Sequence, residues 1–123
     1  MAAGALGVGA RMWVSGAIAG ALGESFPLGT LVANLTGCFA IGIFWGLCGP
    51  DGQFLVPGLT RQAVMVGFLG GYTTFSSFSL QTLALLNGGQ AALAALNAVA
   101  SLLGCLLACW LGLSAAAFLN SRL

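Results

Sequence analysis

The sequence predicts an all-α membrane protein, with four transmembrane helices in one domain spanning residues 1–123. Only 4% of its residues are charged, against about 25% in a typical soluble domain, and its mean hydropathy is +1.06. The sixty residues from Gln62 to Ser121 contain no Asp, Glu, Lys or Arg. Because a span needs about 20 apolar residues, the chain has room for four or five crossings.

Four apolar segments account for most of the chain, and we expect spans at residues 4–23, 28–47, 62–86 and 91–119. The connections between them are rich in glycine, proline and polar residues, which interrupt helices. The turn at 87–90 is so short that the third and fourth spans must be antiparallel. The fourth segment is longer than a span requires, which predicts a tilted or projecting helix.

Small residues recur at helical spacing and predict close contacts between helices. They form two pairs and one stripe: Gly16 and Gly20; Gly42 and Gly46; and Gly104, Ala108 and Gly112.

The third segment contains the stretch around which the chain is organised. Gly70 and Gly71, followed by Tyr72, Thr73 and Thr74, are poor residues with which to continue a helix. In a hydrocarbon core, irregular backbone is tolerated only where it is buried in protein or lines a polar cavity. We therefore expect a broken third helix whose break holds an ion.

Two phenylalanines follow this break. Phe75 and Phe78 are three residues apart, so they lie on one side of the resuming helix. Alone they indicate only packing, but the hydroxyl residues around them include Thr74 and Ser77. The positive edge of an aromatic ring could contact a small anion without trapping it.

Other intramembrane polar residues allow two interpretations each. Asn34, one turn after Thr30, either bonds to a neighbouring helix or lines a pore. Arg11 either reaches the lipid headgroups or sets a positive charge beside an anion path.

A polar stripe on the fourth segment is similarly open to two readings. Its members recur every four residues and serve either interhelical hydrogen bonding or successive replacement of an ion's water; they are Asn97, Ser101, Cys105 and Cys109.

The composition excludes several classes of function. Four cysteines without any histidine or CxxC motif make a zinc site or disulfide framework unexpected. A net charge of +1 gives no reason to expect nucleic acid. No enzyme is expected either, because the sequence offers no histidine, no acid inside a span and no nucleophile–base pair.

Three motifs in this sequence resemble those of the Fluc (CrcB) fluoride channels. The stretch 67–79 (GFLGGYTTFSSFS) closely resembles their third-helix signature, while 27–37 (PLGTLVANLTG) and 7–11 (GVGAR) resemble motifs of their second and first helices. The resemblance extends over the whole chain in the number, order and spacing of the spans.

The resemblance implies a fluoride-exporting channel in the cell inner (plasma) membrane. It implies an antiparallel, dual-topology homodimer with two fluoride pores and a central structural sodium ion. The backbone carbonyls of Gly70 and Thr73 correspond to the sodium ligands, and Arg11 to a basic residue near the vestibule. The residues expected to line the fluoride pore are Asn34, Thr74, Phe75, Ser77, Phe78, Ser101, Cys105 and Cys109.

Three departures from the family pattern bear on conductance. Cys105 and Cys109 stand where hydroxyl residues are common, and thiols are weaker donors. Gln81 stands where a glutamate is frequent, and Asn97 where some relatives have an aromatic residue.

Two other functions fit a small four-helix membrane protein. A proton-coupled small multidrug transporter would need a membrane-embedded carboxylate, but the only acids, Glu24 and Asp51, lie in predicted turns. A non-transporting scaffold subunit would need small-residue stripes but no hydroxyl-rich broken helix.

Arg61 and Arg122 would lie on the same side of the membrane and give a small bias towards cytoplasmic termini.

Overall fold

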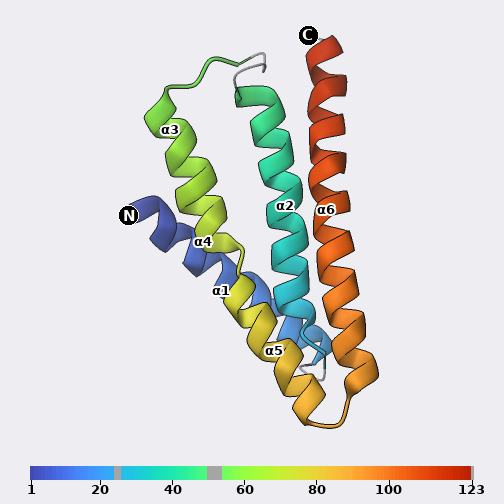
Figure 1. Ribbon diagram of the computed structural model, residues 1–123. Helices are drawn as coiled ribbons and strands as arrows, with labels where there is room; N and C mark the ends of the chain where they lie inside the picture. Colours follow the sequence, from blue (N-terminus) through green and yellow to red (C-terminus); the bar gives the residue numbers. More distant parts are fainter. Residues whose placement is uncertain (24–25, 50–53, 123) are drawn as a thin grey trace.

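The computed structural model describes residues 1–23, 26–49 and 54–122, which are all helix or short connection. Four helical rods, each long and apolar enough to cross a membrane, run alternately up and down (Figure 1). The first, second and fourth are single helices: α1 (Ala2–Leu22), α2 (Leu28–Cys48) and α6 (Ala91–Arg122). The third consists of α3 (Gly58–Gln62), the π-helix η1 (Ala63–Leu69), α4 (Gly70–Tyr72) and α5 (Phe75–Asn87).

Helices α2 and α6 run parallel and form the largest contact in the molecule (Figure 1). Their backbones approach closely at Gly42, where an added Cβ would collide with the carbonyl of Cys109, and at Gly112, where it would collide with that of Phe39. Gly46 faces Ala116 in the same way. The predicted contact roles of the Gly42–Gly46 pair and of the stripe containing Gly112 are therefore confirmed.

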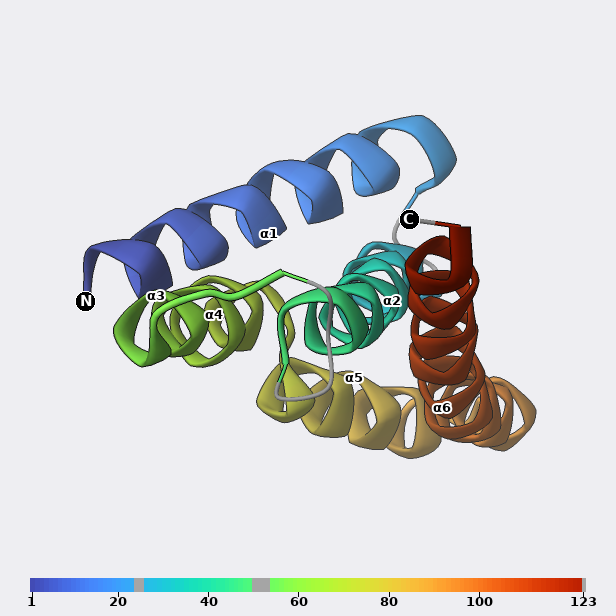
Figure 2. The ribbon, with the colours of Figure 1, turned by 90° about the horizontal axis from the view of Figure 1, so that it is seen from above.

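Helix α1 packs along η1, α4 and α2 (Figure 2). An added Cβ at Gly7 would collide with the carbonyl of Phe68, and one at Gly71 would lie 2.7 Å from the carbonyl of Gly4. Gly16 and Gly20, by contrast, have nothing within 4 Å of such an atom in the described chain. The contact predicted for this pair is therefore not made within one chain.

The helical hydrogen bonding of the third rod is interrupted later than the glycines suggested. Gly70 has helical backbone angles (φ −63°, ψ −37°) and begins α4, whereas Thr73 (ψ 156°) and Thr74 (φ −149°, ψ 123°) are extended. Gly71 serves close packing against Gly4 of α1. Gly71 therefore permits the close approach of α1, and the chain leaves helical geometry only after it, at Thr73 and Thr74.

The ends of the rods extend slightly beyond the predicted bounds. The third rod starts at Gly58 rather than at residue 62, directly after Pro57, and α6 continues to Arg122 rather than to residue 119. Hydropathy locates the apolar part of a helix but not the polar turns that complete it. Glu24 and Asp51, both expected in turns, lie outside the described residues.

The turn between α5 and α6 is tight, as predicted. Gly89 adopts a positive φ of 79°, and the amide of Gln90 donates to the carbonyl of Leu85 (2.9 Å). A positive φ is accessible to glycine without a steric penalty.

Candidate functional site

A groove of about 600 Å³ runs between α2, the extended residues after α4, α5 and α6. Seven of the eight side chains predicted to line a pore meet in it, although they come from three separate rods. Its lining comprises Asn34, Cys38, Thr73, Thr74, Phe75, Phe78, Ala98, Ser101, Leu102, Cys105, Leu106 and Cys109.

The buried side chain of Asn34 joins α2 to the interruption. Its Nδ2 donates to the carbonyl of Thr74 (3.0 Å), and the Thr74 amide donates to its Oδ1 (2.7 Å). This pairing satisfies both main-chain groups of a residue outside the helical ladder, which apolar surroundings require. An amide group has two N–H donors, so one donor of Asn34 is not used by this pairing.

The same interruption redirects two amides that a continuous helix would use internally. In a regular α-helix, the Gly70 carbonyl would accept from the Thr74 amide and the Thr73 carbonyl from the Ser77 amide. Here the Thr74 amide donates to Asn34, and the Ser77 amide donates to Oγ1 of Thr74 (3.3 Å). The carbonyls of Gly70 and Thr73, which the family resemblance singles out, therefore have their regular helical donors engaged elsewhere.

Helix α2 also approaches the interruption closely at Gly37, three residues after Asn34. An added Cβ at Gly37 would collide with the methyl group of Thr73 and lie 3.1 Å from the ring of Tyr72. The hydroxyls of Thr36 and Tyr72 are hydrogen-bonded (2.8 Å). These contacts hold α4 against α2 just before the chain leaves the helix.

Two aromatic rings form the α5 side of the groove. The centroids of Phe75 and Phe78 are 5.3 Å apart with their planes inclined by 51°. Both residues line the groove, and an aromatic ring has a negative face and a positive edge. Phe75 is 79% exposed in the single chain, which leaves its ring accessible to an ion or to a second subunit.

The α6 side of the groove carries weak donors. Ser101, Cys105 and Cys109 line it, one turn apart. Asn97, the first member of the predicted stripe, is only 2% exposed and instead donates to Oγ1 of Thr82 on α5 (2.8 Å). Asn97 thus makes an interhelical hydrogen bond, one of the two roles expected for this stripe, and it also accepts from Ser101 (3.5 Å).

Two residues assigned to an ion path from the sequence lie outside the groove. Ser77 does not line it, although its amide donates to the Thr74 side chain that caps the start of α5. Arg11 is half-buried on α1, away from the groove lining.

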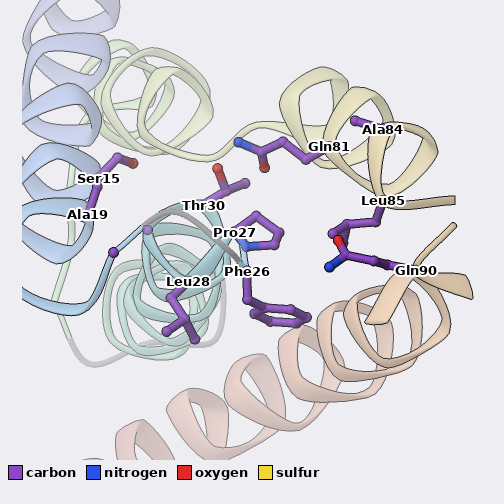
Figure 3. A pocket seen from close by; sticks show the side chains of 12 residues that line it. Ser15, Ala19, Phe26, Pro27, Leu28, Thr30, Gln81, Ala84, Leu85 and Gln90 are labelled. Atoms are coloured by element: carbon purple, nitrogen blue, oxygen red, sulfur yellow. The ribbon is translucent and has the colours of Figure 1, made fainter. Parts of the chain in front are cut away.

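A second hollow of about 530 Å³ lies near the connection from α1 to α2 and the turn from α5 to α6 (Figure 3). The side chain of Gln81 extends from α5 towards Thr30 across this hollow, and Ser15 of α1 lies on the far side. The amide oxygen of Gln81 is buried and has no hydrogen-bond partner among the described residues. Sequence reasoning noted Gln81 only as a departure and missed this hollow, for which the shared polarity of Thr30 and Gln81 was the available signal.

The family model described as "CrcB-like protein, Camphor Resistance (CrcB)" matches residues 1–113 of this chain. The chain belongs to the CrcB-like family. Its similar relatives include a protein of Rhodospirillum rubrum named fluoride-specific ion channel FluC, 56% identical over 97% of this chain and 92% of its own length. A protein of Opitutus terrae with the same name is 54% identical over 96% of this chain and 89% of its own length.

Membership of the CrcB-like family agrees with the resemblance found in the three motifs. Together with the four membrane-spanning helices, it identifies a multi-pass membrane protein. The names of the relatives describe ion channels, which are not enzymes, as the composition predicted.

Proposed function

We propose that this chain forms a fluoride-selective channel that lets fluoride leave the cell across the inner membrane. The observation that carries the proposal is the groove, in which Asn34, Phe75 and Ser101 from three different rods line one path. Relatives about half identical to this chain are named for fluoride, which supports the choice of ion.

The chemistry of the groove suits a small, strongly hydrated anion. The N–H of Asn34 that Thr74 does not use can replace a water molecule, and so can the positive edges of the two phenylalanine rings. The hydroxyl of Ser101 can do so on leaving its long hydrogen bond to Asn97 (3.5 Å). None of these groups carries a charge, so an ion is solvated without being held tightly.

The test is fluoride efflux from proteoliposomes, followed with a fluoride electrode. We expect rapid fluoride loss and no comparable chloride loss under the same gradient. Equal efflux of the two ions would contradict selectivity, and empty liposomes serve as the control for leakage.

We further propose that the channel is an antiparallel, dual-topology homodimer with two pores. The exposed ring of Phe75 and the uncovered faces of Gly16 and Gly20 are surfaces that a second copy could cover. The chain contains only three Lys and Arg residues in total, so positive charge favours one orientation of membrane insertion only weakly. Labelling of Gln90→Cys, at the exposed α5–α6 turn, should occur from both sides of the membrane; labelling from one side only, in active protein, would exclude dual topology.

A structural sodium ion between the two subunits completes the proposal. The carbonyls of Gly70 and Thr73 fit such a hard cation because their regular helical donors are engaged elsewhere. The bound ion would supply positive charge that compensates these carbonyl dipoles away from water. Replacing sodium by N-methylglucamine should lower the unfolding temperature of the purified dimer, and an unchanged temperature would argue against the site.

A further inference from the structure

Two cysteine side chains of α6 stand four residues apart and face the same groove. Cys105 and Cys109 both line it, both are half-buried and free, and α6 is continuous helix through this region. The proposed passage of fluoride does not require sulfur at either position. We propose that these two thiols form a binding site for a neutral, trivalent aryl arsenical, in which arsenic carries one aromatic ring and two exchangeable oxygen ligands.

The helical register sets the distance between the two side chains. Residues four apart in an α-helix lie on one face, with their Cβ atoms about 5–6 Å apart. A disulfide needs Cβ atoms about 3.5–4.5 Å apart, so a direct S–S bond is disfavoured, whereas a single atom between the sulfurs can bridge them. Helix α2 also holds this part of α6 in place, because a Cβ added at Gly42 would collide with the carbonyl of Cys109.

The number of thiols that the helix offers selects the class of ligand. Among the described residues, no three His, Cys, Asp or Glu side chains are arranged to hold a metal ion. Zinc prefers four protein ligands in a structural site, and inorganic arsenite binds three thiols. An aryl arsenical has one arsenic position already occupied by carbon, so two thiols complete its coordination.

Binding exchanges oxygen for sulfur without oxidation or reduction. Phenylarsine oxide in water carries two hydroxyl groups on arsenic. Each thiol forms an As–S bond as one As–O bond breaks, and the thiol proton leaves with the hydroxide as water. Arsenic remains trivalent, two water molecules are released, and no co-reactant is needed.

The lining of the groove favours a neutral aromatic ligand over a metal cation. Leu102, Leu106 and the rings of Phe75 and Phe78 line the same space as the two thiols. An unpaired cation is costly to move into apolar surroundings, and a neutral arsenical avoids this cost. The groove, of about 600 Å³, has the size of pockets that bind small organic molecules. A phenyl group held there would obstruct it.

The experiment measures binding directly and so does not depend on fluoride transport. The full-length protein in detergent is treated with phenylarsine oxide and challenged with excess 2-mercaptoethanol, and the retained arsenic per chain is determined. We expect one arsenic atom per wild-type chain, released by the dithiol dithiothreitol. Cys105→Ser and Cys109→Ser should each retain arsenic roughly a hundredfold less well, because the second thiol acts at high effective concentration.

The other two cysteines provide matched controls. Cys48→Ser, at the end of α2 and outside the groove lining, should retain arsenic like the wild type. Cys38→Ser should do so too, although Cys38 lines the groove, because the bridge joins two thiols of α6. Undiminished retention by Cys105→Ser or Cys109→Ser, or loss of arsenic from Cys38→Ser, would overturn the site. Retained arsenic with undiminished fluoride efflux would uphold the site and contradict the assignment of the groove as the pore.

Discussion

The side-chain amide of Asn34 and the main chain of Thr74 form a reciprocal pair of hydrogen bonds, 3.0 Å and 2.7 Å long, forty residues apart in sequence. These two hydrogen bonds hold α2 to the point where the third rod leaves helical geometry. It also frees the carbonyl of Gly70 from its regular partner. One side chain thus helps determine both the shape of the groove and the chemistry of the interruption.

Asn34→Ala should destabilise the protein and reduce fluoride efflux. Both main-chain groups of Thr74 would lose their partners, and each buried unsatisfied group costs about 1–3 kcal/mol. The measurement is thermal unfolding in detergent together with the liposome efflux assay. Asn87→Ala, at the exposed end of α5, is the control, and equal stability of the two variants would show that the pair is unimportant.

Phe75→Ile and Phe78→Ile should each slow fluoride efflux strongly while the protein stays folded. Isoleucine keeps apolar bulk but removes the positive ring edge. Phe118→Ile provides a comparison, since Phe118 lies near the end of α6 and packs against Arg122 instead of the groove. Normal efflux in both groove variants would show that these rings serve packing and not conduction.

Cys105→Ser and Cys109→Ser should increase fluoride efflux, with the largest gain in the double variant. A hydroxyl is a better hydrogen-bond donor than a thiol and occupies the same position on the groove wall. Efflux per reconstituted protein is the quantity to compare, with Cys48→Ser as the variant that leaves the wall unchanged. A slower double variant would mean that donor strength does not limit conduction.

Gly7→Ala and Gly9→Ala form a matched pair on one helix. A Cβ at position 7 would collide with the carbonyl of Phe68, whereas one at position 9 would meet nothing within 4 Å in the chain. Gly7→Ala should therefore lower the unfolding temperature. Gly9→Ala should be neutral or stabilising by up to about 1 kcal/mol from helix propensity. Similar losses in both would place Gly9 in an interface with another subunit.

The sequence was sufficient to predict the four rods because each depends on a long apolar run, a local property. The resemblance to a known family grouped Asn34, Phe75 and Ser101 along one ion path, and the structure brings these residues into one groove. The expected stretch from Gly70 to Thr74 includes the two extended residues, but the sequence did not show that its glycines stay helical, because glycine propensity does not reveal that α1 packs against Gly71. The partner of Asn34 and the hollow beside Gln81 depend on contacts between distant segments, which single-residue preferences do not encode.

The direct backbone contact between α2 and α6 has a mechanical consequence for the groove. Moving α6 by one residue would bring Leu111 or Leu113 to the place of Gly112, where even a single added carbon collides with the carbonyl of Phe39. Sliding of these two helices is therefore blocked, and together they act as a stationary wall. A change in groove width that keeps α2 and α6 in contact would therefore have to come from the opposite wall, which is formed by the rings of Phe75 and Phe78 and the extended residues that precede them.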